Sequence, residues 1–425
     1  MVRSQQLQSV DMSDQVASVA KTEKLDVSVI QRRLKQGTIV IPWNPIHHPQ
    51  ALGIGKDLRV KVNANIGTSR EYCHLDEELA KAQAAVDAGA HAVMDLSTGG
   101  NLDDIRKKLL QQVSVPFGTV PIYQTGIEAI EKHGAVIDMT EDDIFNTFER
   151  QAKQGVDFTV VHVGVTKTSV ERLKRQKRLI PMVSRGGSFH MAWILHHEQE
   201  NPLYENFEYL LELAKNYNVT LSLGDGMRSG ALYDSNDRAK LQELLIIGEL
   251  VEQARAQGVQ AMVEGPGHMP LQDIVSNMQI MKTITKGAPY FVLGPLVTDI
   301  APGYDHLVGG IGGALAGMYG ADFLCYLTPA EHLCLPDVDD VRQGVIATRI
   351  AAHAADLARG IDADIDQRFS TAREHLDWDT MFALCIDPKK AKEYRKKRSP
   401  VEDEHACSMC GNLCAIELVK KYLKN

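Results

Sequence analysis

Three cysteines near the end of the chain have the clearest capacity for inorganic chemistry. The segment Cys407-Ser-Met-Cys410-Gly-Asn-Leu-Cys414 places two residues between the first pair of thiols and three between the second. A loop with this spacing can direct three thiolates at one centre, either a zinc ion with a further ligand or an iron–sulfur cluster. In a four-iron cluster, one iron would lack a cysteine and could bind another molecule. The spacing alone leaves both alternatives open.

Polar or glycine-flanked residues stand at the ends of most segments that are predicted to be strands. Because the active sites of parallel barrels lie at the carboxyl ends of their strands, these positions predict one shared pocket. A single member such as His162 could equally be a buried structural histidine. The candidate pocket residues are Asn65, Met94, Tyr123, His162, Ser184, Arg185, Gly186, Asp225, Gly226, Met227, Arg228 and Glu264.

Two features near this pocket indicate more specific chemistry. Glycines beside Arg185 and Arg228 would let backbone N–H groups approach an oxyanion, to which the guanidinium groups bring charge. A substrate that carries a phosphate fits this pattern, and tight turns with surface ion pairs are the structural alternative. His268 and His332 follow strands that are expected to be close, and with Glu264 or a water they could hold a divalent metal.

A run of glycines at positions 309–313 resembles a phosphate-binding loop only in composition. It lacks the Lys-Ser/Thr pair that follows such a loop, so close helix packing by small residues explains it better. We therefore assign these glycines a packing role.

The elements that must position the candidate residues alternate between strands and helices. Segments with the two-residue period of strands are separated by segments with helical periodicity. This alternation predicts a parallel sheet, and about eight such units favour a closed (β/α)8 barrel of the TIM type in an α/β protein. One or two further strands are predicted outside the barrel. The predicted strands include 59–65, 92–96, 117–122, 158–163, 180–183, 219–223, 260–263, 290–293 and 321–327.

Domain boundaries follow from where the alternation begins and ends. We expect an N-terminal arm at 1–58, the catalytic barrel at 59–335, a helical region at 336–398 and a cluster-binding tail at 399–425. The basic run 389–398 is interpreted as the solvated face of a helix. Helices are predicted at, among other places, 27–35, 141–154, 339–359, 372–378, 388–397 and 415–423.

Composition excludes several classes of protein. The chain has 425 residues and a formal net charge of -9, which disfavours general nucleic-acid binding. The first 25 residues lack the apolar core of a signal peptide, and no apolar run is long enough to span a bilayer. We therefore expect a cytoplasmic protein without membrane contact. Seven cysteines are an odd number, and the scattered ones are interpreted as packing residues rather than disulfides, namely Cys73, Cys325, Cys334 and Cys385.

Several motifs resemble those of the thiamin pyrimidine synthase family. They are Val-Lys-Val-Asn-Ala-Asn-Ile-Gly, Met-Asp-Leu-Ser-Thr-Gly-Gly, Val-Ser-Arg-Gly-Gly, Ser-Leu-Gly-Asp-Gly, Met-Val-Glu-Gly-Pro-Gly-His and Thr-Asp-Ile-Ala-Pro-Gly-Tyr-Asp-His. The resemblance implies a radical S-adenosylmethionine lyase that acts on 5-aminoimidazole ribotide. It also implies a [4Fe–4S] cluster, S-adenosylmethionine, a divalent metal usually taken as zinc, an electron donor, and a homodimer in which the tail can reach the partner's barrel.

The resemblance further implies roles for individual residues. Cluster ligation falls on Cys407, Cys410 and Cys414, and metal ligation on His268 and His332. Contacts with the ribotide fall on the twelve pocket residues named above. Two of these, His162 and Glu264, are candidates for carrying protons.

Some positions depart from the pyrimidine synthase pattern. The last cysteine gap is three residues instead of four, and the family's Pro-Phe-Tyr reads Pro289-Tyr290-Phe291. Strand alternation would turn the Tyr290 phenol away from the pocket. Because such changes surround the substrate, we expect the 5-hydroxybenzimidazole synthase paralogue of anaerobic cobamide biosynthesis. The alternative is phosphomethylpyrimidine synthase of thiamin biosynthesis, and a zinc-dependent barrel hydrolase and a non-catalytic regulatory relative are more distant alternatives.

Overall fold

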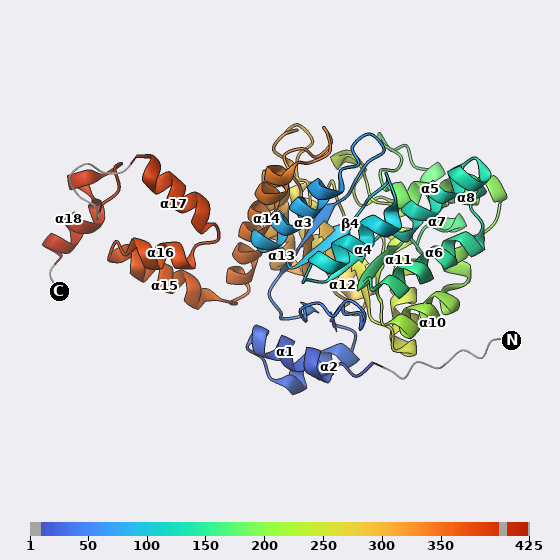
Figure 1. The fold of residues 1–425 in the computed structure, drawn as a ribbon, viewed down its shortest axis with the longest axis horizontal. Coiled ribbons are helices and arrows are strands. Elements are labelled where there is room, and N and C mark those ends of the chain that lie inside the picture. Colours follow the sequence, from blue (N-terminus) through green and yellow to red (C-terminus); the bar gives the residue numbers. More distant parts are fainter. Residues whose placement is uncertain (1–9, 399–405, 424–425) are drawn as a thin grey trace. The chain divides into compact units, whose positions relative to one another are not determined.

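The computed structural model describes residues 10–398 and 406–423. Residues 1–9 of the predicted arm and 399–405 of the predicted tail lie outside these ranges. Eight parallel strands close into a barrel in the order β10-β3-β4-β5-β6-β7-β8-β9 (Figure 1), which confirms the predicted TIM-type α/β fold. The strands are β3 (Lys61–Ile66), β4 (Ala92–Asp95), β5 (Phe117–Thr119), β6 (Phe158–Val161), β7 (Thr220–Leu223), β8 (Ala261–Glu264), β9 (Tyr290–Leu293) and β10 (Phe323–Cys325).

Helices connect successive strands and cover the outside of the barrel (Figure 1). They are α3 (Leu75–Asp87), α4 (Leu102–Gln112), α5 (Pro121–His133), α6 (Glu141–Gln154), α7 (Lys167–Lys174), α8 (Arg185–His197), α9 (Pro202–Glu205), α10 (Phe207–Tyr217), α11 (Arg238–Gln257), α12 (Leu271–Ile284), α13 (Asp305–Tyr319) and α14 (Val338–Ala358), with short 3-10 turns η1 (Val136–Asp138) and η2 (Leu232–Asp234).

The segment before the barrel contains two helices and a strand pair. The helices are α1 (Ser13–Glu23) and α2 (Val27–Lys35), of which only α2 is predicted from the sequence. β1 (Ile39–Val40) pairs antiparallel with β2 (Ile54–Gly55). These two strands lie outside the barrel, where one or two strands are expected.

Helix α6 shows how local sequence sets the element boundaries. The Thr140 hydroxyl accepts a hydrogen bond from the Asp143 N–H at 3.1 Å, and the Asp143 carboxylate accepts one from the Thr140 N–H at 3.0 Å. This reciprocal cap satisfies N–H groups that the first turn leaves without partners, and the acidic first turn suits the helix dipole. The helix ends at Gly155, whose φ of 108° favours glycine. The predicted bounds 141–154 are confirmed.

Among the predicted strands, one is absent from the structure and several others, including 117–122, 158–163 and 321–327, are shorter than predicted. Residues 180–183 form no strand, and α8 begins directly after them with Ser184 as its cap. Strand β5 ends at Thr119 instead of reaching residue 122, because Pro121 starts α5. A proline fits the first turn of a helix, where its missing N–H leaves no hydrogen bond unmade. Both errors have the same cause, since apolar residues at a helix start resemble a strand in period.

Aromatic side chains fill the interior of the barrel below the site. Phe291 of β9 stacks on Phe323 of β10 with ring centroids 4.3 Å apart, and Phe158 of β6 meets Phe323 edge-on at 6.2 Å. All three rings are almost completely buried. This apolar layer gives the polar strand ends above it a rigid floor.

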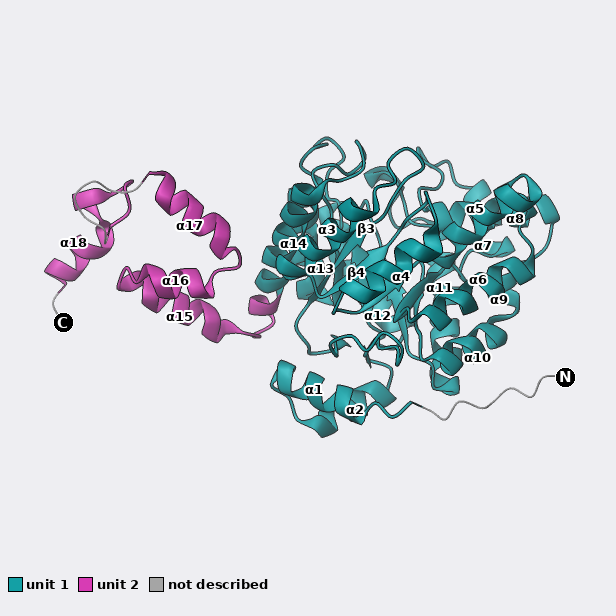
Figure 2. Ribbon diagram, viewed as in Figure 1, with its two compact units in different colours: residues 1–355 teal, residues 356–425 magenta. Residues whose placement is uncertain are grey.

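The chain divides into two compact units, residues 1–355 and 356–425 (Figure 2). The second unit contains α15 (Ala363–Glu374), α16 (Trp378–Leu384), α17 (Pro388–Lys397), η3 (Gly411–Leu413) and α18 (Ala415–Tyr422). The predicted helix 372–378 is wrong, because Leu376 takes a positive φ of 52° and separates α15 from α16. Within the described parts of the chain, no helix combines the length and apolar character needed to cross a bilayer.

Candidate active site

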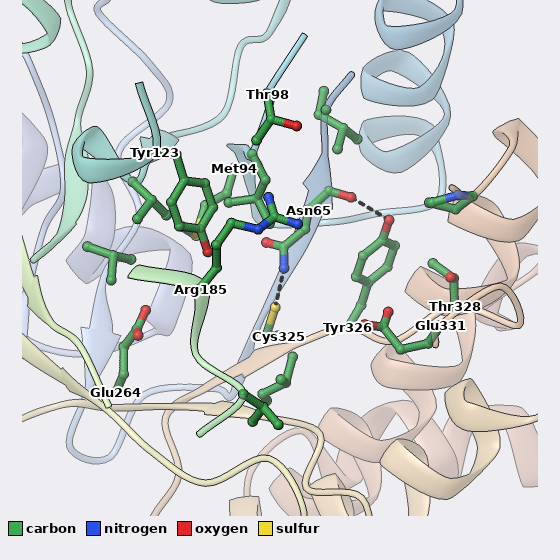
Figure 3. Close-up of a pocket in the computed structure, with 18 of the residues that line it drawn as sticks. Asn65, Met94, Thr98, Tyr123, Arg185, Glu264, Cys325, Tyr326, Thr328 and Glu331 are labelled. Carbon is green, nitrogen blue, oxygen red and sulfur yellow. Dashed lines mark hydrogen bonds between the residues drawn. The ribbon is translucent and has the colours of Figure 1, made fainter. Parts of the chain in front are cut away.

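A cavity of about 440 Å³ opens at the carboxyl ends of the barrel strands (Figure 3). Its position is the one that the strand-end residues predict. The predicted residues that line it are Asn65, Met94, Tyr123, His162, Arg185, Arg228, Glu264 and His332. The other predicted barrel residues do not line it, and these are Ser184, Gly186, Asp225, Gly226, Met227 and His268.

Asn65 of β3 forms hydrogen bonds with two other residues that line the cavity, Cys325 of β10 and the following Tyr326. Its side-chain amide donates to the Cys325 sulfur at 3.0 Å, and its backbone carbonyl accepts from the Tyr326 hydroxyl at 2.6 Å (Figure 3). Burial raises the pKa of Cys325 to about 12, so the group is a neutral thiol. Sequence reasoning assigned Cys325 to packing, although its place two residues after inward-facing Phe323 indicates that it faces the barrel interior.

Two arginines give the cavity positive charge. The Arg185 guanidinium lies over the Tyr123 ring, 5.0 Å from its centroid. Burial raises the pKa of the Tyr123 phenol, against the opposing effect of Arg228 and Arg185. A cationic rim with planar N–H donors above a neutral phenol is suited to a phosphate or carboxylate group.

Ser184 and Gly186 act on His162 rather than on the cavity directly. The Ser184 hydroxyl accepts the Gly187 N–H at 3.1 Å as the cap of α8 and lies 3.1 Å from His162 Nε2. A Cβ on Gly186 would come within 2.2 Å of the His162 ring, so only glycine fits there. Burial holds the pKa of His162 well below its usual range, and the ring is neutral. Its Nδ1 has no hydrogen-bond partner among the described residues.

The turn Asp225 to Arg228 is held from behind by α11. The N–H groups of Gly226 and Met227 each donate to the Glu243 carboxyl at 2.8 Å, and Asp225 forms a buried ion pair with Lys240. Backbone N–H groups that were expected to face an oxyanion are thus already occupied. Of this turn only Arg228 lines the cavity.

Glu264 at the end of β8 combines burial with an opposite charge. Burial raises its pKa to about 7, and the nearby Arg228 guanidinium limits the rise. A carboxyl group with this pKa exists in both protonation states near neutral pH, as a group that exchanges protons requires.

The alternation of side chains along β9 turns Tyr290 out of the cavity, as predicted from the sequence. Tyr290 points away from the cavity, and its hydroxyl donates to the Asn277 side chain of α12 at 2.9 Å. Phe291 lines the cavity in its place. The aromatic ring that β9 presents to the cavity therefore has no hydroxyl.

His268 and His332 lie beside one another, with ring centroids 5.2 Å apart. His268 Nδ1 lies 2.8 Å from Asp299 Oδ1, so Nδ1 faces the carboxylate and Nε2 is the nitrogen left for a metal. His332 Nδ1 lies 3.5 Å from Asp305 Oδ1, and the buried Asp305 Oδ2 has no hydrogen-bond partner among the described residues.

A histidine held by a carboxylate, as His268 is by Asp299, with a second histidine beside it, fits a divalent metal such as zinc. The positive φ of 62° at His332 is an uncommon conformation for a residue other than glycine, of the kind found at functional sites. Across residues 10–398 and 406–423, no three His, Cys, Asp or Glu side chains are already gathered as an ion site. A metal here would therefore need ligands beyond the two imidazoles.

The three tail cysteines belong to the second unit and lie on a compact turn. The N–H groups of Cys410 and Gly411 donate to the Cys407 carbonyl at 3.1 and 2.9 Å. The Cys410 N–H also lowers the pKa of the Cys407 thiol, while interaction with Cys407 raises the pKa of Cys410. Two interacting thiols, with Cys414 at the start of α18, fit a shared soft metal centre.

The fold defines a parallel (β/α)8 barrel protein with two arginines in the cavity at its strand ends, and the second unit carries a loop of three cysteines suited to a soft metal centre. A sequence profile described as "Radical SAM ThiC family" matches residues 3–421. The chain belongs to this family, which uses S-adenosylmethionine and a [4Fe–4S] cluster. The family is the one that the sequence motifs indicate.

Relatives with assigned names match over nearly their full length. A phosphomethylpyrimidine synthase of Moorella thermoacetica is 56% identical over 95% of this chain and 94% of its own. The enzyme of the same name from Methanocaldococcus jannaschii is 52% identical over 96% of both chains. Phosphomethylpyrimidine synthase 2 of Methanothermobacter thermautotrophicus is 52% identical over 99% of this chain and 100% of its own.

These relatives overturn the expectation of a 5-hydroxybenzimidazole synthase and of a role in cobamide biosynthesis. That expectation was drawn from a few departures such as Tyr290-Phe291. In the structure, Phe291 lines the cavity and the Tyr290 hydroxyl bonds to Asn277 outside it, so this departure concerns one hydroxyl of the cavity wall. A single missing contact does not define the product of a reaction.

Proposed function

We propose that this protein converts 5-aminoimidazole ribotide into hydroxymethylpyrimidine phosphate, the reaction of a phosphomethylpyrimidine synthase in thiamin biosynthesis. The observation that carries the proposal is the 56% identity to the Moorella thermoacetica enzyme over 95% of this chain. The cavity supports it, because a phosphosugar substrate needs cationic donors at one side and polar groups within an enclosed space.

In this proposal, Arg185 and Arg228 bind the phosphate of the ribotide. Both line the cavity, and their guanidinium groups can each make paired hydrogen bonds to phosphate oxygens. Asn65 and Tyr123 line the same cavity and orient the remainder of the substrate. The aromatic floor formed by Phe291 and the rings beneath it excludes water from below.

Cys407, Cys410 and Cys414 would hold the [4Fe–4S] cluster, which together with S-adenosylmethionine supplies radical chemistry when bound. The remaining chemistry falls to side chains of the barrel. Glu264, with a pKa of about 7, exchanges protons near neutral pH. His162 stays neutral because it is buried, and its Nδ1 has no hydrogen-bond partner among the described residues. His268 and His332 would hold a divalent metal at the edge of the cavity.

Anaerobic incubation with S-adenosylmethionine, a low-potential reductant and the ribotide, followed by mass spectrometry, tests the proposal. We expect hydroxymethylpyrimidine phosphate and deoxyadenosine as products. Cys410→Ala should abolish both, whereas Cys73→Ala, which changes a thiol remote in sequence from the tail, should retain both. A different product from the ribotide, or deoxyadenosine formation that is unchanged in Cys410→Ala, would refute the proposal. A colourless protein with zinc bound at the tail would refute it as well.

A further inference from the structure

Helix α17 in the second unit carries an unusual concentration of positive charge. Residues 388–398 contain seven Lys or Arg and one Glu, in a chain whose formal net charge is -9. The exposed members are Lys389, Lys390, Lys392, Lys396, Lys397 and Arg398. Glu393 is the single acidic side chain among these cations on α17, so the helix keeps a clear excess of positive charge that would attract an anionic partner. We call these six side chains the basic face.

The basic face is anchored beside the cysteine loop. Arg395 of α17 donates to the backbone carbonyl of Ala406, the residue before Cys407, at 3.2 Å. The Arg395 guanidinium also stacks over the Trp378 ring, 3.8 Å from its centroid, which ties α17 to α16. These two contacts fix the helix next to the first thiol (Figure 2 shows α17 within the second unit).

An apolar surface adjoins both the basic face and the thiols. A groove of about 620 Å³ is lined by Tyr394 and Lys397 of α17 together with Cys407 and Met409. The Met409 side chain is 91% exposed and Leu413 is 79% exposed. Exposed apolar residues beside the cysteines that would hold a redox centre, flanked by mainly positive charges, suit a transient electron-transfer contact.

We propose that the basic face of α17, with Met409 and Leu413, is the docking surface for an acidic one-electron carrier protein that reduces the centre on the tail cysteines. The inference rests on the proposed function, because that chemistry needs one electron for each cleavage of S-adenosylmethionine. In the transfer, one electron leaves the reduced carrier and enters the cysteine-bound centre, and no bond or proton changes place. An acidic carrier is chosen because charge complementarity to the basic face steers its approach.

The experiment compares two charge reversals of equal size in the cluster-loaded enzyme. Lys390→Glu/Lys397→Glu changes the basic face, and the control Lys107→Glu/Lys108→Glu changes two exposed lysines of α4 on the barrel. A photoreduced flavodoxin of net negative charge is the probe. Its affinity is measured by titration, and cluster reduction is measured by bleaching of the visible absorbance.

At low salt, we expect the α17 variant to bind flavodoxin about tenfold more weakly and to be reduced by it about tenfold more slowly than the wild type. Both differences should disappear at high salt. The control should match the wild type, and reduction by the small cation methyl viologen should be equal in all three proteins. If the reversal disturbs folding, Lys390→Gln/Lys397→Gln should show a smaller decrease of the same kind.

Equal flavodoxin affinity and equal bleaching in the two charge-reversed proteins would overturn the docking proposal. So would tight binding of DNA or anionic vesicles at α17 with unchanged reduction by flavodoxin. Failure of the proposed function is separate, because it would appear as absence of product from the ribotide even when viologen reduces the enzyme. The binding titration remains informative in either case.

Discussion

His268 and His332 lie with their ring centroids 5.2 Å apart, and a different aspartate stands beside each imidazole. Asp299 is the partner of His268, at 2.8 Å from Nδ1. Groups of this kind fix the tautomer and direction of a metal-binding imidazole, and their loss typically weakens the metal site 10- to 100-fold. The pair is therefore the part of the barrel where a divalent ion can be tested most directly.

We predict that Asp299→Asn weakens binding of Zn²⁺ to the purified protein by about 10- to 100-fold. The reason is that an amide orients His268 less strongly than a carboxylate and adds no charge. Competition with a chromophoric chelator measures the affinity. Asp87→Asn, at an exposed carboxylate that accepts a hydrogen bond from Gln83, is the control and should bind zinc like the wild type. Equal affinities in both variants would show that these histidines do not hold the metal.

The raised pKa of Glu264 predicts that the stability of the protein depends on pH. Burial raises its pKa from 4.5 to about 7, so the unfolded chain releases this proton at lower pH than the folded protein does. Stability contributed by the protonated carboxyl is therefore complete below pH 4.5 and is lost as the pH rises towards 7. Glu264→Gln has no carboxyl proton to lose. The free energy of unfolding of this variant, relative to that of the wild type, should therefore increase across this pH window by on the order of 3 kcal/mol.

Chemical denaturation at pH 5 and pH 8 measures this difference. The control is Glu249→Gln, an exposed position on α11, for which the difference from the wild type should be the same at both pH values. If the curves for Glu264→Gln and the wild type stay parallel between pH 5 and pH 8, the Glu264 carboxyl ionises normally in the folded protein.

Much of the barrel is predictable because its signals are local. The reciprocal cap at Thr140 and Asp143 sets the start of α6 within four residues of sequence, and Gly155 sets its end. The alternation of β9 correctly separates Tyr290 from Phe291. The periodicity of the sequence does not locate the boundary where a helix starts directly after a strand-like segment, as at Pro121 and Ser184. There the same apolar run contains both the strand-like residues and the start of the helix.

The candidate site is predictable as a set of strand ends but not in its detailed contacts. Asn65, Met94, His162 and Glu264 line the cavity because inward-facing residues end their strands there. The N–H groups of the Asp225 turn were expected to face a ligand, yet they donate to a side chain on α11. Such a partner comes from tertiary packing, which no local pattern in the sequence records.

That partner, Glu243, is predicted to position the Arg228 turn. It accepts the N–H groups of Gly226 and Met227 at 2.8 Å each, so Glu243→Ala leaves two buried donors without acceptors. We expect a loss of about 2–4 kcal/mol in the free energy of unfolding. The KM for the ribotide should rise because Arg228 is no longer fixed.

Glu249→Ala is the matched control, since Glu249 lies on the same helix and is exposed. Denaturation and steady-state kinetics on both variants measure the effect. If Glu243→Ala is as stable as Glu249→Ala and has the same KM, the turn keeps its conformation without α11.

The glycines at 309–313 lie inside α13, and their packing distances separate two interpretations of this run. A Cβ on Gly312 would lie 2.0 Å from the Pro295 carbonyl oxygen, which is backbone and cannot move aside easily. On Gly310 the nearest atom would be the Ala347 carbonyl oxygen at 3.7 Å, an ordinary contact. Gly312→Ala should therefore destabilise the protein by about 1–3 kcal/mol. Gly310→Ala should stabilise it by about 0.5–1 kcal/mol, because alanine loses less backbone entropy in a helix.

Urea denaturation of the two variants measures these opposite shifts, and the KM for the ribotide provides the second readout. If the run packs α13 against the segment at Pro295, Gly310→Ala leaves that KM unchanged, since no glycine N–H in a helix interior is free to bind phosphate. A phosphate-binding run would behave differently. Both substitutions would then raise the KM, and their effects on stability would not follow the 2.0 and 3.7 Å spacings.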